Sequence, residues 1–111
     1  MKFVSICSVK DILSTLPPAA VRKILEATTA WVNQKKQAGK LLEIYGITGW
    51  RRSLVIYEAE SAEEIVQTVT ENPLGAFLDH EVYALADFNE VMKLNIESVK
   101  RAEQLFPGTS K

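Results

Sequence analysis

The sequence predicts an α+β fold with the element order β-α-β-β-α-β, followed by one further helix at the C-terminus. Two observations lead to this order. First, two apolar runs rich in β-branched and aromatic residues flank a glycine-containing break, which is typical of a β-hairpin. Second, apolar residues recur at three- and four-residue spacing on either side of that hairpin, which is typical of helices. The order is that of the ferredoxin-like split βαβ arrangement.

The hairpin is predicted within residues 39–61. Its arms are Leu41–Tyr45 and Ser53–Tyr57, and each is about the length of an ordinary strand. Gly46 and Gly49 supply the flexible backbone that a turn or a bulge between the arms needs.

The second arm of the hairpin is apolar on both faces, since Leu54 and Ile56 point one way while Val55 and Tyr57 point the other. Helices of the same chain can cover one face. A chain of 111 residues has little left for the other face, so we expect a second copy of the protein to cover it. Two such sheets packed face to face form a dimeric α/β barrel, and the expected state is a homodimer or a higher homo-oligomer.

The elements before and after the hairpin follow from periodicity and capping. A first strand is predicted at Lys2–Val9, where β-branched residues alternate along the run. Pro17 and Pro18 predict the start of a helix that ends at Gly39. A fourth strand is predicted within Gly75–Phe88. The first helix carries one apolar stripe, which consists of Val21, Ile24, Leu25, Thr28, Trp31 and Val32.

A capping box predicts where the second helix begins. The Ser61 hydroxyl is placed to accept from the backbone N–H of Glu64, whose carboxylate is placed to reach back. Asn72 and Pro73 end this helix. Its predicted buried stripe consists of Ala62, Ile65, Val66 and Val69.

A last helix is predicted after the cap signal of Asp87 and Glu90, and it ends at Pro107. We expect residues 1–88 to form the ferredoxin-like α/β-barrel domain, and residues 89–111 to form a helix and tail packed on that domain or on a partner subunit. The tail at 109–111 is expected to fray. The apolar stripe of the helix consists of Phe88, Met92, Val99, Ala102 and Phe106.

Composition restricts the classes of partner. The chain has 13 basic and 14 acidic residues and a net charge of −1, which predicts no contact with nucleic acid or an anionic membrane surface. No segment approaches transmembrane length or has the pattern of a signal peptide, so a cytoplasmic location is expected. Cys7 is the single cysteine, which excludes a disulfide framework and a Cys-based metal site and predicts a buried, inert thiol in a reducing compartment.

Several short motifs are spread along residues 39–85: Gly39-Lys40, Gly49, Glu60-Ser61, Pro73-Leu74 and the run Asp79-x-Glu81-Val82-x-Ala84-Leu85. With these motifs the stretch resembles the muconolactone Δ-isomerase family, small cytosolic enzymes of aromatic catabolism built on the dimeric α/β-barrel fold. Gly46 stands where the family has a basic residue, His80 replaces an aliphatic residue, and the final helix is longer than the family's tail, so no family catalytic residue is transferred to this chain.

This resemblance implies an isomerase that moves a proton along a conjugated lactone or a related small organic acid. Such chemistry needs a base, an acid and a group that stabilises enolate charge, and it needs no metal or cofactor. The catalytic candidates are His80, Glu43 and Glu81, and the substrate-binding candidates are Tyr45, Trp50, Arg51 and Arg52. Tyr45, Trp50, Arg52 and His80 are expected to line a cavity between the fourth strand and the hairpin.

Alternatives remain for these residues. His80, Glu43 and Glu81 fit ordinary hydrogen-bonded or solvated positions, and Trp31 fits the core. Haem ligation by His80 is less well supported, because the sequence offers one histidine, no second ligand motif and a small chain. The main alternative function is a non-catalytic small-molecule-binding or oligomeric barrel protein.

Overall fold

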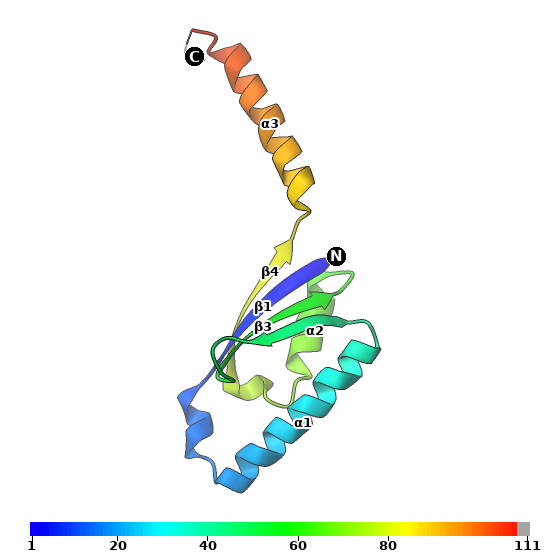
Figure 1. Cartoon of the computed structure of the whole chain (residues 1–111), viewed down its shortest axis with the longest axis vertical. Coiled ribbons are helices and arrows are strands. Elements are labelled where there is room, and N and C mark those ends of the chain that lie inside the picture. Colours follow the sequence, from blue (N-terminus) through cyan, green and yellow to red (C-terminus); the bar gives the residue numbers. More distant parts are fainter. Residues whose placement is uncertain (109–111) are drawn as a thin grey trace.

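The computed structural model describes residues 1–108 and has the predicted element order (Figure 1). The prediction for the tail at 109–111 lies outside the described residues. Short 3₁₀ helices at Asp11–Thr15 and Gly75–Phe77 precede α1 and β4. The strands are β1 (Lys2–Val9), β2 (Leu41–Gly46), β3 (Arg52–Glu58) and β4 (Leu78–Leu85), and the helices are α1 (Pro18–Gln37), α2 (Ala62–Thr70) and α3 (Phe88–Leu105).

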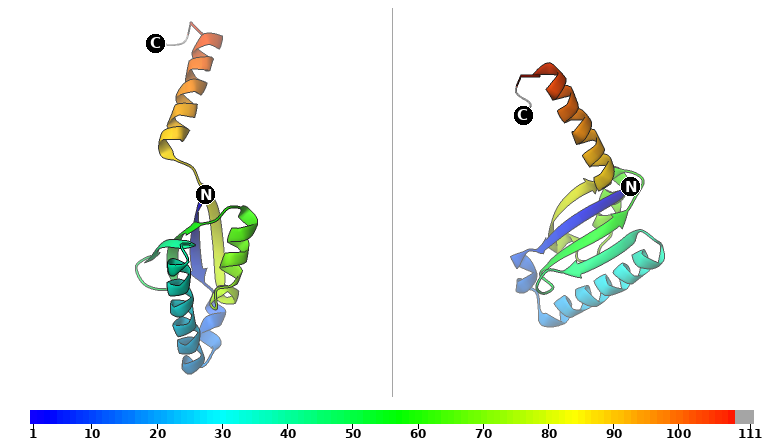
Figure 2. Two further views of the ribbon diagram at one scale, coloured as in Figure 1. Left: turned by 90° about the vertical axis from the view of Figure 1, so that its right-hand side faces the viewer. Right: turned by 45° about the horizontal axis from the view of Figure 1, so that its top comes forward.

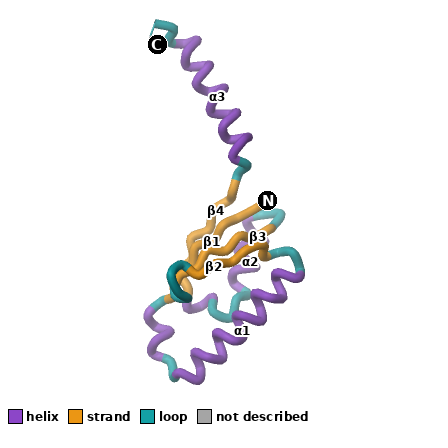
Figure 3. Tube along the Cα trace, in the orientation of Figure 1, coloured by secondary structure: helices purple, strands orange, loops and turns teal. Residues whose placement is uncertain are grey.

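The strands form one antiparallel sheet in the order β2-β3-β1-β4, so β2 and β4 are its edges (Figure 3). This order and the crossover connections are those of the ferredoxin-like split βαβ fold, which confirms the predicted fold class. The register of β2 against β3 shifts between Leu41 and Glu43 through a bulge.

Helices α1 and α2 cover the same face of the sheet, which we call the covered face (Figures 1 and 2). Trp31 of α1 and Ile65 of α2 pack in one buried cluster with Phe3, Val55 and Tyr57 of the central strands. A second buried cluster, which consists of Cys7, Leu13, Leu74 and Leu78, lies toward the start of α1. The core is therefore divided into two clusters along the length of α1.

The capping box predicted for α2 is confirmed. Ser61 Oγ accepts from the backbone N–H of Glu64 at 3.1 Å, while Glu64 Oε2 accepts from the backbone N–H of Glu60 at 2.8 Å. The predicted stripe is wrong at two positions, since Ala62 and Val66 are exposed, whereas Thr68, which was not in the stripe, is buried. Burial of Thr68 is tolerated because its hydroxyl donates to the backbone carbonyl of Glu64 at 3.0 Å.

The opposite face of the sheet, which we call the open face, is covered by neither α1 nor α2. At its centre Val4 and Ile6 of β1 pair with Ile56 and Leu54 of β3. These side chains are only half-buried, so the prediction that an apolar face is left uncovered by the chain's own helices is confirmed.

Helix α3 projects away from the sheet, and all of its residues are exposed (Figures 1 and 2). Asp87, in the short link after β4, has an extended backbone, so the chain continues in the direction of the edge strand rather than folding back. Packing of α3 on its own domain, which was one of the two expected arrangements, is therefore not seen. Packing on a partner subunit stays a prediction.

Candidate functional site

A cavity of about 400 Å³ lies between α1 and the covered face of the sheet. The cavity lies between the two buried clusters, and residues of each cluster line it. The first cluster contributes Trp31, Val55 and Tyr57, and the second contributes Cys7 and Leu78. The volume is in the range of cavities that hold small organic molecules, and the walls are mainly aliphatic and aromatic, as such sites usually are.

The hairpin turn folds over one end of this cavity. A Cβ atom on Gly46 would clash with the backbone carbonyl oxygen of Gly49, so the close approach of the turn requires glycine at this position. Thr48 and Gly49 both have positive φ angles, 52° and 144°. Glycine at position 46 thus lets the turn bring Trp50 and Arg51 to the cavity, which both residues line.

Arg51 provides the cationic group of the cavity mouth, and the Trp50 ring lies beside it. The Arg51 guanidinium carbon lies 5.5 Å from the centroid of the Trp50 ring, a cation–π contact. Arg51 Nη2 also lies 3.7 Å from Oδ1 of Asp11, a fully exposed carboxylate. A solvent-exposed ion pair of this length is weak, so the guanidinium retains donors for an anionic ligand.

Cys7 lies on the inner wall of the cavity and contacts His80, which stands behind it. They face each other across β1 and β4, and Cys7 Sγ lies 3.4 Å from His80 Nδ1. Ser5 Oγ lies 3.3 Å from the same sulfur atom. Cys7 is buried as predicted, but its side chain lines the cavity and contacts the single histidine of the chain.

Two further polar groups of the cavity lining carry a proton. Burial raises the pKa of the Tyr57 hydroxyl well above its ordinary value, and the neighbouring Cys7 raises it further. Tyr57 is therefore protonated at neutral pH and can donate. Trp31 is 8% exposed, and its Nε1–H has no hydrogen-bond acceptor among residues 1–108.

The structure does not bring together the predicted set of Tyr45, Trp50, Arg52 and His80. Tyr45 lies on β2 and His80 on β4, at opposite edges of the sheet and on opposite faces. Arg52 pairs with Ser8 across the strands, on the open face. Of this set, Trp50 lines the cavity, and His80 reaches its wall through Cys7.

The carboxylates proposed from the sequence also lie on the open face. Tyr45 Oη donates to Glu43 Oε1 at 3.0 Å, and Tyr83 Oη donates to Glu81 Oε2 at 3.1 Å. In each pair the hydrogen bond to the carboxylate is the main cause of a raised tyrosine pKa. Neither Glu43 nor Glu81 lines the cavity, so any role for them in a reaction there stays a prediction.

Cys7, Trp31 and Tyr57 are the cavity residues that the sequence interpretation missed. Alternation along Lys2–Val9 indicated which side chains share a face with Cys7, and the fold predicted that the first and fourth strands are neighbours. To predict the contact between Cys7 and His80, the register of the first strand against the fourth was also needed. A pattern of alternating residues does not determine that register.

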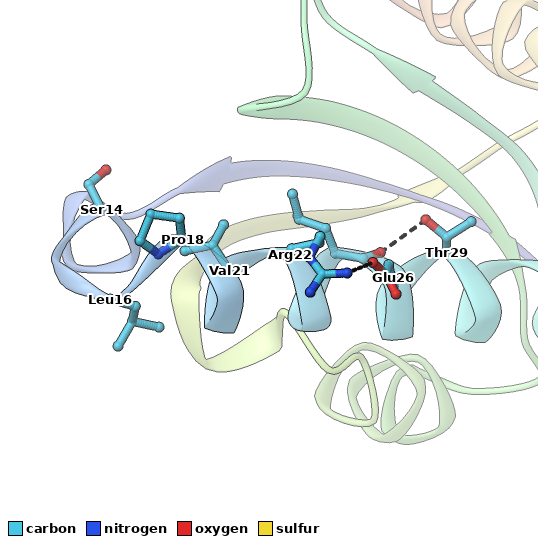
Figure 4. Close-up of a pocket in the computed structure, with 8 residues that line it drawn as sticks. Ser14, Leu16, Pro18, Val21, Arg22, Glu26 and Thr29 are labelled. Atoms are coloured by element: carbon cyan, nitrogen blue, oxygen red, sulfur yellow. Dashed lines mark hydrogen bonds and ion pairs between the residues drawn. The ribbon is translucent and has the colours of Figure 1, made fainter.

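A second hollow, of about 510 Å³, lies outside the first turns of α1 (Figure 4). Three of its polar side chains are already paired, because Arg22 Nη1 lies 3.3 Å from Glu26 Oε1 and the Thr29 hydroxyl donates to the Leu25 carbonyl at 3.0 Å. It is an open groove along one helix and offers no buried polar group, so the inner cavity is the better candidate site despite its smaller volume.

The described residues contain no cluster of three or more histidine, cysteine or carboxylate side chains suited to hold a metal ion. Among the helices at 1–108, none is both long enough and apolar enough to cross a membrane.

Comparison with solved structures supports the fold. A muconolactone isomerase crystal structure superposes with a TM-score of 0.67 at 22% identity, covering 78% of this chain and 90% of that one. A 5-chloro-2-hydroxyhydroquinone dehydrochlorinase from Burkholderia phenoliruptrix, in complex with 2,5-dihydroxybenzoquinone, superposes with a TM-score of 0.60 at 18% identity, covering 81% of this chain and 98% of that one.

Comparison with curated protein sequences finds no match. The family model for muconolactone delta-isomerase, in contrast, matches residues 1–91, which include all four strands, α1 and α2. Most of α3 lies beyond this match. The chain therefore belongs to the muconolactone delta-isomerase family.

Proposed function

We propose that the protein binds a small organic acid or lactone in the cavity of the covered face and isomerises it by cofactor-independent proton transfer. The observation that carries this proposal is an apolar cavity of about 400 Å³ with Arg51 and Trp50 at its mouth and Cys7 and Tyr57 on its walls. This combination suits a compact molecule with one anionic group and one polarised carbonyl.

Arg51 is the group that selects for an anion. Its guanidinium can hold a carboxylate through two parallel hydrogen bonds, and the Trp50 ring beside it covers the adjoining carbon skeleton. Deeper in the cavity, the protonated Tyr57 hydroxyl is suited to donate to a carbonyl oxygen that gains charge when a neighbouring carbon loses its proton.

The relatives support the same class of ligand. The two solved structures are named for action on muconolactone and on a chlorinated hydroxyhydroquinone, and the second contains a dihydroxybenzoquinone. All three are small cyclic molecules with several oxygens. A cavity that has one cationic residue at its mouth and neutral donors on its walls fits molecules of this size and polarity.

The test is turnover of muconolactone in deuterated buffer, followed by NMR for both isomerisation and deuterium incorporation. Arg51→Gln is expected to raise KM by about tenfold with a smaller change in kcat, because the lost contact to the carboxylate is made in both the ground state and the transition state. Arg22→Gln, which removes a guanidinium from the outside of α1, is the control and is expected to change neither constant. An Arg51→Gln enzyme with an unaltered KM would contradict the assignment.

Ligand binding without turnover is the second candidate function. It is favoured by the absence of any carboxylate among the described residues that line the cavity, since carboxylates are common bases in proton transfer. Muconolactone that binds and acquires no deuterium would support this function over isomerisation.

We also propose that the protein is a homodimer joined through its open face. The support is the half-buried apolar centre formed by Val4, Ile6, Leu54 and Ile56, which a second copy of the same sheet would cover. A cytoplasmic location is part of the proposal, and its support is the free Cys7 thiol, which fits a reducing compartment.

A further inference from the structure

We propose that Cys7 and His80 form the proton-transfer pair of the cavity, with the Cys7 thiolate as the base that contacts the substrate and His80 as the group that takes the thiol proton. The inference deepens the proposed function and rests on it for the identity of the substrate. The pair itself can be tested without any substrate.

The contacts of the sulfur atom define the pair. Cys7 Sγ lies 3.4 Å from His80 Nδ1, which is within hydrogen-bond distance for sulfur, and the two residues are directly opposed on neighbouring strands. Ser5 Oγ lies 3.3 Å from the same sulfur and is fully buried. An imidazole that accepts the thiol proton and a hydroxyl that donates to sulfur both favour the thiolate form.

The position of the pair relative to the cavity gives it access to a ligand. Cys7 lines the cavity, whereas His80 stands behind it and does not. The sulfur is therefore the atom that a bound molecule meets, and the imidazole is a positioning and proton-holding residue that acts through it.

An independent feature of the same cavity points to a ligand with an acceptor oxygen. Trp31 is more than nine-tenths buried, lines the cavity, and has an Nε1–H without an acceptor among residues 1–108. A buried donor left unpaired is costly, so a carbonyl oxygen bound beside this indole would gain a hydrogen bond that the protein itself does not supply.

The proposed step balances without any co-reactant. The Cys7 thiol passes its proton to His80 Nδ1, and the resulting thiolate removes a proton from a carbon next to a carbonyl group. The electron pair of the broken C–H bond moves to the carbonyl oxygen, where Tyr57 Oη–H or Trp31 Nε1–H donates to it. Cys7 then returns the proton to another carbon of the conjugated system, which regenerates the thiolate and leaves a shifted double bond.

Few charged or titratable side chains lie around the Cys7 sulfur atom. Tyr57 approaches from β3, His80 from β4, and Arg51 lines the same cavity from the hairpin turn. No aspartate or glutamate is among the described residues lining the cavity. The imidazole is thus the base nearest to the thiol.

The first test measures the rate at which iodoacetamide alkylates Cys7 between pH 5.5 and 9.5, in the unmodified protein and in His80→Gln. The unmodified protein is expected to keep most of its rate at about pH 6, because the imidazole holds the thiol proton. In His80→Gln the rate should fall about a hundredfold from pH 9 to pH 6, as for an unassisted thiol. His80→Asn is a second variant in case the first does not fold, with circular dichroism as the check on both.

The second test measures deuterium incorporation into muconolactone. Cys7→Ser should lower this rate by at least about a hundredfold, since a serine hydroxyl is a far weaker acid than a thiol, while the Kd for muconolactone changes by less than about threefold. His80→Gln should lower the rate most strongly at low pH. A Cys7→Ser protein with full activity would overturn the proposal.

The two tests separate the pair from the proposed function. If muconolactone neither binds nor exchanges but alkylation depends on His80, the pair stands and the proposed function is wrong. If muconolactone is isomerised while alkylation of Cys7 follows the same pH profile with and without His80, the proposed function stands and the pair is wrong.

Discussion

The two faces of the single sheet both carry apolar residues on β1 and β3, but their polar side chains are arranged differently. On the covered face, Cys7, Trp31 and Tyr57 border a cavity. On the open face, each tyrosine hydroxyl donates to a glutamate two residues earlier on its own strand. Polar groups whose donors and acceptors can engage a ligand are therefore concentrated where the helices exclude water.

The open face instead has the layout of an interface between proteins. Its apolar centre lies on β1 and β3, and a Glu–Tyr pair stands on each edge strand, Glu43–Tyr45 on one side and Glu81–Tyr83 on the other. An apolar centre with a polar rim is the usual anatomy of a protein–protein contact. This difference supports the proposal that the covered face binds the ligand and that the open face joins two copies of the chain.

The largest effect on stability is expected on the covered face. Ile65→Ala should lower the free energy of unfolding by about 2–5 kcal/mol, because Ile65 is 2% exposed and its loss leaves a hole in the buried cluster. Val66→Ala, one residue along α2 and 57% exposed, is the matched control and should change it by less than about 0.5 kcal/mol. Urea denaturation measures both, and equal effects would contradict the assignment of the buried side of α2.

A charge on the open face should break the assembly and leave the fold intact. Ile56→Glu is expected to raise the dissociation constant of the dimer by about a hundredfold, because a carboxylate would then be buried without a partner. Sedimentation equilibrium measures the constant, and circular dichroism checks that the variant is folded. An unmodified protein that is a stable, folded monomer at micromolar concentration would disprove the dimer.

Removal of α3 should affect the assembly of subunits more than it affects the folding of the α/β domain of one subunit. All residues of α3 are exposed in the isolated chain, and its apolar stripe includes Phe88, Met92 and Val99. Each such side chain contributes about 1.5–3 kcal/mol when it is fully buried against a partner. A chain that ends at Asp87 should therefore melt at a lower temperature or change its mass in light scattering, whereas an unchanged melting curve and mass would show that α3 is dispensable.

A smaller effect is expected at the start of α2. Ser61→Ala removes the acceptor for the Glu64 backbone N–H and should lower the free energy of unfolding by about 1 kcal/mol. Ser61→Asp keeps an acceptor oxygen at the cap and should restore most of this loss. Equal stability of Ser61→Ala and the unmodified protein in thermal denaturation would show that the cap adds nothing.

The smallest effect concerns an ion pair at the surface. Lys35 Nζ lies 2.8 Å from Glu71 Oε2, and this hydrogen bond is the main reason that the pKa of the Glu71 carboxyl is lowered. Since the folded-state pKa lies below the unfolded value, the pair stabilises the fold above the ordinary glutamate pKa, and this contribution is lost as the pH falls through the lowered value. Lys35→Met should raise the NMR titration midpoint of Glu71, and an unshifted midpoint would contradict the cause.

Much of the fold follows from the sequence because periodicity, proline and capping act locally. The strand alternation in Lys2–Val9, the proline start of α1 and the Ser61 cap each depend on neighbouring residues. The α1 stripe is oriented as predicted, with Trp31 buried and the other stripe residues partly buried.

The site could not be predicted as well, because it depends on register. Strict alternation along β2 would set Leu41 and Tyr45 on one face of the sheet. The bulge between Leu41 and Glu43 keeps Leu41 on the covered face and turns Tyr45 to the open one. One extra residue in the ladder thus reverses the face of every later side chain on that strand.

The surface on which α3 packs could also not be predicted from the sequence. Its amphipathic pattern predicts that one side is buried, but the pattern holds no information about which surface covers it. The extended backbone at Asp87 then directs α3 away from its own sheet.

The comparison of the two faces is tested most directly by NMR titration with muconolactone. The indole N–H signals of Trp31 and Trp50, assigned with Trp31→Phe and Trp50→Phe, should shift together with the amide of Val55, because all three residues line the cavity. The amides of Tyr45 and Tyr83, on the open face, should stay in place. Shifts confined to Tyr45 and Tyr83, with both indole signals unmoved, would contradict a ligand site on the covered face.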